Sequence, residues 1–285
     1  MLMNLKEILK TARENSFAVP AFNISDYPMF NAIIELAEEK NAPVIIEIHP
    51  DELAFIKDEM VVGIRERLMK SGVPTCLHLD HSGWEAIVRA VRDGFTSVMI
   101  DASSKSFEEN AAITKKVCEL AHPLGISVEA ELGTIGNTDG ETDAGTANII
   151  YTKPEDAAAF VAATGCDALA IAIGTAHGIY PSNMQPELKQ ELLSEIKNSV
   201  SVPLVLHGGS GNKDTEIAEA VKRGINKINI SSDIKVAYFE KMREVLQDKK
   251  QREPNTICPP CMEAMKAVAL HKMELFGAVG KAELY

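Results

Sequence analysis

The sequence lacks a long hydrophobic run and an excess of positive charge. Its apolar stretches all fall short of the roughly 20 residues that a membrane-spanning helix needs, and its N-terminus, MLMNLKEILK, is too charged for the apolar core of a signal peptide. Lys and Arg number 29 against 41 Asp and Glu, and the resulting net charge of -12 disfavours nucleic acid and membrane as partners. We therefore expect a cytoplasmic protein that binds a small molecule and holds any anionic ligand through local groups.

Cysteine is scarce as well. Five cysteines, an odd number in a chain of 285 residues, exclude a disulfide framework. Cys76, Cys118 and Cys166 stand in apolar segments and are interpreted as core residues. Cys258 and Cys261, in CPPC, have the spacing of a zinc or redox motif, but no second ligand pair and no βαβ unit surrounds them. We interpret CPPC as an ordinary turn.

The sequence is rich in short apolar runs that alternate with amphipathic stretches. The runs cover 17–24, 43–49, 74–81, 97–103, 127–133, 167–174, 203–210 and 227–233. Segments between them, such as MFNAIIELAEEKN and NAAITKKVCELAHPLG, have apolar residues at helical spacing. These eight β/α units, with strands too apolar to face water, predict an α/β fold of the (β/α)8 TIM-barrel type. An open doubly wound sheet is the alternative.

The length of the chain fits one barrel domain over residues 1–285. An extra N-terminal helix at about 4–15 precedes the first strand, and a C-terminal helical extension near 261–275 follows the last unit. No segment has the composition of a linker between domains.

Polar residues gather at the C-terminal ends of the predicted strands, where β/α barrels place their active sites. They are His78, Asp80, His81, Asp101, Glu129, Glu131, His177, His207, Asn229, Ser231 and Ser232. Three of them, His81, His177 and His207, come from three different strand ends with carboxylates between them. Imidazole nitrogen suits zinc, and three such ligands with an open fourth position form a catalytic site.

The other histidines are weighed separately. Strand alternation places His78 one layer deeper than Asp80, which favours a structural role. His49, at the tail of the second strand, is open to either interpretation. We expect His122 and His271 to be surface or packing residues.

Six motifs together carry a family resemblance. The segments HLDH, VMIDAS, VEAELG, AIGTAHG, LHGGSG and INI resemble the class II, zinc-dependent ketose-bisphosphate aldolases, the group of the fructose- and tagatose-bisphosphate enzymes. The resemblance implies that His81, His177 and His207 bind the catalytic zinc and that Asp80 donates a proton to the aldehyde oxygen. It also implies a cytoplasmic enzyme that acts on a sugar phosphate, is a homodimer or homotetramer, and uses a monovalent cation as a second candidate cofactor.

The same resemblance assigns further residues. Asp101 and Glu131 line an alternative metal position in some relatives. The residues implied to hold dihydroxyacetone phosphate are Gly178, Gly208, Gly209, Ser210, Asn229, Ile230, Ser231 and Ser232. Asn229 is in addition expected to take part in catalysis.

Chemistry supports these roles independently. Making or breaking a carbon–carbon bond next to a ketone requires an enediolate, which zinc stabilises as a Lewis acid. Asp80, next to a zinc ligand, can then exchange a proton with the developing alkoxide. A Schiff-base mechanism lacks a nucleophile, because Lys227 is expected to open the last strand at the end far from the site. The glycine-rich turns after the last two strands suit phosphate, which main-chain N–H groups bind.

The chain departs from the family pattern in three places. The loop after the fifth strand, TIGNTDGETDAG, has Asp139 where relatives carry a Glu that moves the C–H proton, with Glu141 two residues further on, so the base is one of the two. At the tail of the second strand His49 replaces a small hydroxyl residue. Near the C-terminus Asn255 and Met262 stand where bisphosphate-cleaving relatives have arginines.

These departures shape the expected substrate. Arg252 lies near the missing arginines and is the remaining candidate to replace them. Without an arginine, a second phosphate loses charge-assisted bidentate hydrogen bonds. We expect an unphosphorylated aldehyde, such as a longer sugar or a sugar acid, with His49 among its contacts.

Two other classes of function remain open. A barrel-type zinc hydrolase would use the same histidines, but such enzymes usually have a His-x-His pair on the first strand, and PAFNI lacks it. A non-catalytic subunit that binds sugar phosphate would be expected to lose a metal ligand or the acid. This chain keeps the three histidines and Asp80.

Overall fold

The computed structural model describes residues 1–137, 149–178 and 187–285. Eight parallel strands form a barrel in the order β4-β3-β2-β11-β10-β8-β6-β5, and pairing of β5 with β4 closes it. The strands are β2 (Val19–Asn23), β3 (Val44–Ile48), β4 (Thr75–Ser82), β5 (Ser97–Ile100), β6 (Ser127–Leu132), β8 (Ala168–Ile171), β10 (Leu204–Leu206) and β11 (Ile225–Ile230). Each lies within or close to one of the predicted apolar runs, so the barrel prediction is confirmed and the open sheet is wrong.

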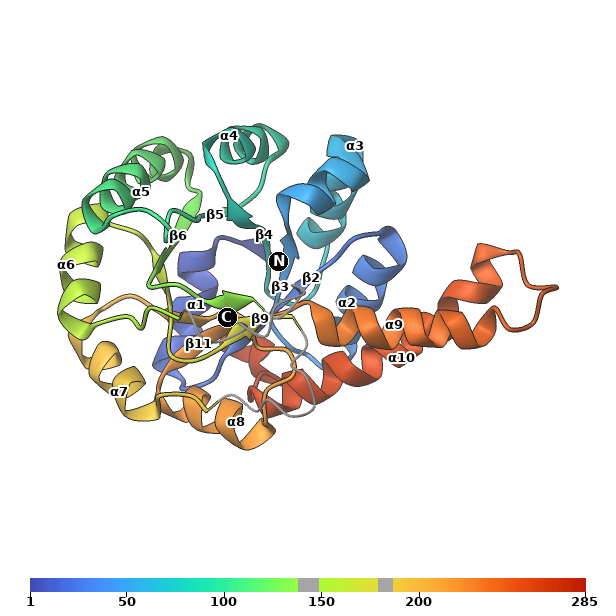
Figure 1. Cartoon of the computed structure of the whole chain (residues 1–285). Coiled ribbons are helices and arrows are strands. Elements are labelled where there is room, and N and C mark those ends of the chain that lie inside the picture. Colours follow the sequence, from blue (N-terminus) through green and yellow to red (C-terminus); the bar gives the residue numbers. More distant parts are fainter. Residues whose placement is uncertain (138–148, 179–186) are drawn as a thin grey trace.

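Helices surround the barrel as a ring (Figure 1). They are α2 (Tyr27–Glu39), α3 (Pro50–Met69), α4 (Trp84–Asp93), α5 (Phe107–Ala121), α6 (Pro154–Thr164), α7 (Gln190–Ser199), α8 (Asp214–Arg223) and α9 (Ser232–Val245). Local signals fix their ends: Ser106 and Glu109 form a capping box at the start of α5, and Gly94 ends α4 in the left-handed conformation that glycine favours. A large apolar core lies between the strands and this ring.

Short elements complete the chain. The strand β1 (Leu2–Met3) pairs with the start of β4, and β7 (Gly136–Asn137) pairs with β9 (Ala176–His177). Two 3-10 turns, η1 (His122–Leu124) and η2 (Lys281–Leu284), follow α5 and end the chain. No helix in the described ranges combines the length and apolarity that a bilayer span requires.

The helix α1 (Leu5–Glu14) confirms the helix predicted at about 4–15, and it covers the N-terminal end of the barrel. Its apolar face, including Leu5, Ile8 and Leu9, is completely buried. The face packs against a small apolar cluster inside the barrel to which Ala21 and Ala170 belong. Small residues there leave room for the helix, so apolar side chains fill the N-terminal end of the barrel.

The C-terminal helix α10 (Pro254–Leu275) runs beside α9, and together they form an arm that projects from the barrel (Figure 1). It begins earlier than the predicted extension and contains CPPC, so the interpretation of Cys258 and Cys261 as a turn is wrong. Pro259 and Pro260 each remove a backbone donor from the helix. The helix continues because its other face, including buried Cys261 and Met265, contributes to the core.

The closing helix gives a first prediction. Leu9→Ala should lower the free energy of unfolding by about 2–5 kcal/mol, because it leaves a cavity in a fully buried layer. Lys10→Ala is the matched control on the same helix: Lys10 has a side chain 70% exposed and pairs with the exposed Glu14, so its loss should cost far less. Urea unfolding measures both. Equal costs would mean that α1 does not seal the barrel.

Candidate active site

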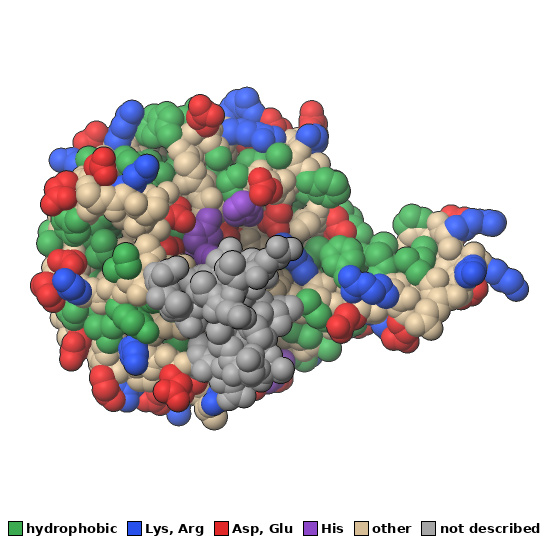
Figure 2. All heavy atoms as spheres, in the orientation of Figure 1, with side chains coloured by type: hydrophobic (Ala, Val, Ile, Leu, Met, Phe, Trp, Pro, Cys, Tyr) green, Lys and Arg blue, Asp and Glu red, His purple; other side chains and the backbone are tan. Residues whose placement is uncertain are grey.

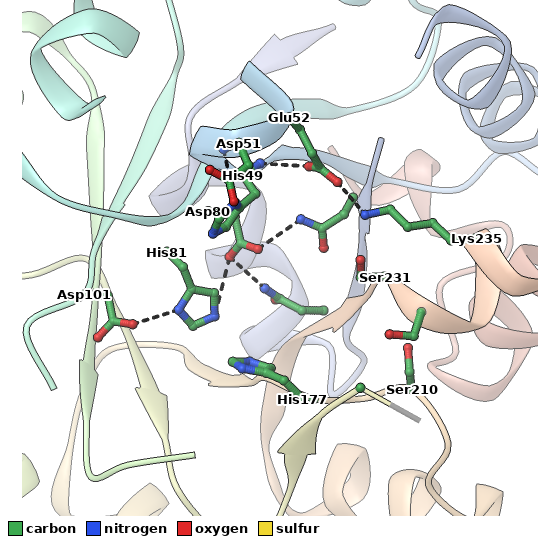
Figure 3. Close-up of a pocket in the computed structure, with 15 residues that line it drawn as sticks. His49, Asp51, Glu52, Asp80, His81, Asp101, His177, Ser210, Ser231 and Lys235 are labelled. Atoms are coloured by element: carbon green, nitrogen blue, oxygen red, sulfur yellow. Dashed lines mark hydrogen bonds and ion pairs between the residues drawn. The ribbon is translucent and has the colours of Figure 1, made fainter. Parts of the chain in front are cut away.

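A pocket of about 520 Å³ opens at the C-terminal ends of the barrel strands. Side chains from β2, β4 and β11 and from the first turns of α3 and α9 converge on it (Figure 3). Figure 2 shows the histidine side chains gathered in a hollow near the centre of this face. The pocket therefore lies at the end of the barrel where the sequence analysis expected the site.

His81, His177 and His207 meet in this pocket. The ring centroid of His81 lies 4.4 Å from that of His207 and 4.8 Å from that of His177. One nitrogen from each ring lies within 4.8 Å of the other two, which is a spacing that a single metal ion can bridge. His81 and His177 line the pocket, and His207 is completely buried beneath them.

A backbone irregularity brings both Asp80 and His81 into the pocket. Neighbouring residues on a regular strand point to opposite faces. Here the pairing of β4 with β5 changes register between Leu79 and Ser82, and His81 has a φ of 36°, in the left-handed region. Such a conformation costs a non-glycine residue on the order of 1–3 kcal/mol and is typical of functional sites.

Carboxylates orient two of the imidazoles. His81 Nδ1 lies 2.9 Å from Asp101 Oδ2, and Asp101 is itself held by the backbone N–H and hydroxyl of Ser103. His207 Nε2 lies 2.8 Å from Glu129 Oε1. Pairs of this kind fix the ring orientation and the tautomer of histidines that bind metals.

The remaining nitrogens of these two rings fit a cation. His81 Nε2 and His207 Nδ1 are buried and have no hydrogen-bond partner among the described residues. Glu131 Oε2, 3.1 Å from His207 Nδ1, likewise lacks a hydrogen bond there. His81, Asp101 and Glu131 form a second group whose ligand atoms lie within 4.8 Å of one another. Imidazole nitrogens with carboxylate oxygens beside them suit zinc.

The three imidazoles differ in protonation. Burial, and then the neighbouring rings, lower the pKa of His177 to about 3, so it is neutral and ready to act as a ligand. Burial opposes protonation of His207, but Glu129 and Glu131 raise its pKa to about 10. Burial also opposes protonation of His81, and Asp80 and Asp101 more than offset it, so its pKa is raised. A divalent cation would replace these protons.

Asp80 lies beside the histidines as an ionised, oriented carboxylate. Its Oδ2 accepts a hydrogen bond of 3.0 Å from Asn23 Nδ2 and its Oδ1 one of 3.1 Å from Asn229 Nδ2. Although burial opposes ionisation, the nearby imidazoles and Lys227 hold the pKa of Asp80 well below its usual range. Asn23 was missed from the sequence, although it ends the first strand in PAFNI and the rule applied to the other strand ends would have found it.

A layer of charged side chains, which includes Lys227, Glu47 and Glu129, lies inside the barrel below the pocket. Lys227 is completely buried inside the barrel, with Nζ 2.7 Å from Glu47 Oε1 and 3.0 Å from Glu129 Oε2. The prediction that it stands far from the site is therefore wrong. Because these carboxylates raise its pKa against the effect of burial, it still cannot serve as a nucleophile. His78 lies in the same layer, with Nδ1 2.8 Å from Ser97 Oγ, as the alternation predicts.

The glycine-rich loop after β10 requires its glycines. Gly208 has a φ of 62°, and a Cβ there would lie 2.4 Å from the carbonyl oxygen of Ala176. A Cβ on Gly209 would lie 2.5 Å from Ile228 Cγ2. Asn212 holds the loop by donating a hydrogen bond of 2.7 Å to the carbonyl oxygen of Gly208. A larger residue at either glycine would displace the loop.

Most residues expected to hold phosphate lie around the pocket. Its wall includes Gly178, Gly208, Ser210, Asn229, Ser231 and Ser232. Ser231 precedes α9 without a side-chain cap, and the N–H of Asp233 in the first turn donates a hydrogen bond of 3.3 Å to Ser210 Oγ. The other N–H groups at this helix N-terminus suit an anionic ligand. Gly209 and Ile230 do not line the pocket, and the Ile230 side chain is buried in the outer core. Asp139 and Glu141 lie outside the described residues.

His49, Glu52 and Lys235 form one wall of the pocket, called the far wall below. The sequence analysis missed Glu52 and Lys235. Glu52 Oε1 pairs with Lys235 Nζ and accepts a hydrogen bond of 3.0 Å from Ser25 Oγ. His49 lines the pocket beside them, and its Nδ1 accepts from the backbone N–H of Asp51 to cap α3 (Figure 3). Lys235 could have been found, because it stands one helical turn after Ser231 and Ser232.

Asn255 and Met262, which stand in place of the family's arginines, and the nearby Arg252 lie outside this pocket. Asn255 and Met262 are in α10, and Arg252, 85% exposed at its side chain, pairs with Glu253 just before that helix. None of the three lines this pocket. His122 contacts Asp167, and His271 contacts Asp214, outside the pocket.

Known proteins resemble this chain along nearly its whole length. The sequence profile of the family described as "Fructose-bisphosphate aldolase class-II" matches residues 3–281. A fructose-bisphosphate aldolase of Staphylococcus aureus is 40% identical over 289 residues, covering 99% of both chains, and one of Thermus caldophilus is 37% identical, covering 99% of this chain and 100% of its own. The crystal structure of the YdjI aldolase from Escherichia coli K12 superposes with a TM-score of 0.88 at 37% identity, covering 99% of this chain and 100% of that one.

The fold, the composition of the pocket and these likenesses agree. The chain is an aldehyde-lyase and belongs to the class II fructose-bisphosphate aldolase family.

Proposed function

We propose that the chain is a zinc-dependent aldolase that reversibly cleaves a ketose 1-phosphate or ketose 1,6-bisphosphate, of the fructose or tagatose type, to dihydroxyacetone phosphate and an aldehyde. The observation that carries this proposal is the convergence of His81, His177 and His207 beside the ionised carboxylate of Asp80. The zinc hydrolase is disfavoured by family membership, and the non-catalytic subunit by the presence of all four residues.

The three histidines would hold the zinc, with Asp101 and Glu131 beside it as an alternative position. Bound there, zinc supplies Lewis-acid stabilisation for negative charge next to the ketone. The protein's own contribution is to keep His81 and His207 oriented through Asp101 and Glu129, with one nitrogen of each ring within 4.8 Å of the other.

Asp80 moves the proton on the aldehyde side. In cleavage its carboxylate accepts the proton of the hydroxyl next to the breaking bond, and in condensation it returns that proton to the aldehyde oxygen. The lowered pKa supplies the ionised form that cleavage needs. Asn23 and Asn229 hold its two oxygens, so its orientation is set before substrate binds. The C–H proton is assigned to Asp139 or Glu141.

Dihydroxyacetone phosphate would bind at the other side of the pocket. Ser210, Ser231 and Ser232 offer hydroxyl groups, and the first turn of α9 offers backbone N–H groups. Uncharged donors at a helix N-terminus hold a phosphate dianion without a basic surface. This explains how a protein with a net charge of -12 can select a sugar phosphate.

The far wall suits an aldehyde with hydroxyl groups. Lys235 is a cation that the sequence analysis did not count, but the carboxylate of Glu52 neutralises it. A donor and an acceptor side by side, with His49 next to them, match the hydroxyl groups of a sugar better than a second phosphate. We therefore propose that the natural aldehyde is unphosphorylated.

We also propose that the protein is a homodimer or homotetramer. The arm of α9 and α10 projects from the barrel, with basic side chains at its tip (Figure 2). Phe239 and Leu246 on this arm are 42% and 45% exposed. A second copy of the chain would cover them and would bring Arg252 toward another surface. Sedimentation at micromolar concentration is the test, and a monomer throughout would contradict the proposal.

The metal assignment predicts the effects of chelation. A chelator should abolish aldol cleavage, and zinc or cobalt should restore it, while borohydride with substrate should trap no adduct. His81→Ala, His177→Ala and His207→Ala should each lower the metal content measured by mass spectrometry. His271→Ala, outside the pocket, is the control and should keep the metal. Full activity in metal-free protein would end this assignment.

The acid assignment predicts a separation of two reactions. Asp80→Ala should keep zinc and dihydroxyacetone phosphate binding but lose cleavage by about 10²-fold or more, since a positioned acid typically contributes 10²–10⁴-fold. Exchange of the C–H proton of dihydroxyacetone phosphate with solvent, followed by NMR, should fall less. Loss of zinc from Asp80→Ala would instead make Asp80 a metal ligand.

The far wall predicts the order of substrates. Fructose 1,6-bisphosphate and tagatose 1,6-bisphosphate should be poorer substrates than a ketose 1-phosphate, because each lost charge-assisted hydrogen bond to a second phosphate weakens binding by about one to two powers of ten. Steady-state kcat/KM for the three compounds decides it. A higher value for either bisphosphate would show that Lys235, or a cation such as Arg252 from a second copy, holds the second phosphate.

A further inference from the structure

Lys227 contacts the side-chain amide of Asn229 from the charged layer below the pocket. Its Nζ donates a hydrogen bond of 2.8 Å to Asn229 Oδ1 and one of 3.2 Å to Glu129 Oε1. Lys227 and Asn229 stand two residues apart on β11, so both point into the barrel. The chain of contacts therefore runs from the buried ammonium group, through one side-chain amide, to Asp80.

The ammonium group determines which way the amide points. The two ends of an asparagine amide have almost the same shape, but the oxygen only accepts hydrogen bonds and the nitrogen only donates them. An ammonium group only donates, so Asn229 Oδ1 faces Lys227 and Asn229 Nδ2 faces Asp80 Oδ1 at 3.1 Å. In the flipped orientation the amide oxygen would face a carboxylate and the amide nitrogen an ammonium group, and both contacts would be repulsive.

Lys227 is suited to this task because it stays charged. Glu47 and Glu129 lie within 3.0 Å of its Nζ and raise its pKa, although burial opposes this. Burial and the nearby Asp80 raise the pKa of Glu47 to about 8, and Glu129 keeps His207 as a second partner. Removing the lysine therefore leaves Glu129 with a donor, which favours folding of a variant without the ammonium group.

We propose that Lys227 is a positioning residue that acts through Asn229: it fixes the orientation of the Asn229 amide, which in turn holds Asp80 for proton transfer. The inference rests on the proposed aldolase function. The competing explanation is that Lys227 only neutralises Glu47 and Glu129, in which case the direction of the amide does not depend on it.

Two substitutions separate these explanations. Lys227→Met and Lys227→Gln both remove the positive charge, but only glutamine keeps an N–H donor for Asn229 Oδ1. Lys227→Met should lower kcat for cleavage by about 10- to 100-fold, the scale expected when a catalytic group is displaced, with KM little changed. Exchange of the C–H proton of dihydroxyacetone phosphate should fall less. Lys227→Gln should recover most of the lost kcat, whereas charge neutralisation alone predicts equal losses.

A double-mutant cycle tests whether Lys227 acts through Asn229. Adding Lys227→Met to Asn229→Ala should lower kcat no further, because the group that transmits the effect is already absent. If the losses of kcat from the two single substitutions multiply in the double variant, the inference is overturned. In metal-free protein, the side-chain amide NMR signal of Asn229, assigned by its loss in Asn229→Ala, should shift in Lys227→Met and return toward its original position in Lys227→Gln.

The outcomes are distinguishable from failure of the proposed function. A folded Lys227→Met enzyme with the kcat of the unaltered protein overturns the role of Lys227 and leaves the aldolase assignment intact. No cleavage by the unaltered, zinc-loaded protein would overturn both. If Lys227→Met does not fold, Lys227→Gln still decides: a kcat clearly above that of Asn229→Ala supports the inference, and a kcat equally low overturns it.

Discussion

The structure depends on burying charged groups inside the barrel in compensated form. A single uncompensated charge there would cost several kcal/mol. Lys227 lies between Glu47 and Glu129, and Glu129 also contacts His207, so neighbouring groups balance one another in the layer below the pocket. Because each group in this layer holds the next, the side chains above it have one defined arrangement. This layer orients His207 through Glu129 and reaches Asp80 through Asn229, whereas Asp101 orients His81 from the end of β5.

The rest of the barrel supports that layer by keeping water out. The helix α1 and a small apolar cluster fill the N-terminal half, and the outer core between strands and helices surrounds the barrel walls. Electrostatic contacts are stronger in such an environment than in water. The left-handed conformation of His81 costs energy, and Asp101, itself held by Ser103, holds the imidazole in place.

Much of this arrangement could be predicted from the sequence, because apolar runs mark strands and strand ends mark the site. The predictions from sequence that were wrong or incomplete have physical causes. Lys227 was predicted to lie far from the site because it begins an apolar run. It stands two residues before Asn229 on the same strand, so both side chains face the inside of the barrel. Glu52 and Lys235 come from helices, to which a rule about strand ends does not apply. CPPC is helical because tertiary packing outweighs local propensity. The bulge at His81 depends on pairing between strands, which no local pattern encodes.

One short segment, from β11 into α9, contributes to several parts of the pocket. Strand alternation turns Lys227 and Asn229 toward the buried layer and Asp80, and the following helical turn presents Ser232 and then Lys235 to the phosphate side and the far wall. The change from a period of two to a period of 3.6 separates these tasks. Under the proposed function, substitution at Lys235 would alter the contacts of the aldehyde without moving Asn229, because the two lie on different elements. The proposed proton-transfer geometry and the proposed aldehyde contacts therefore rest on separate elements of this chain.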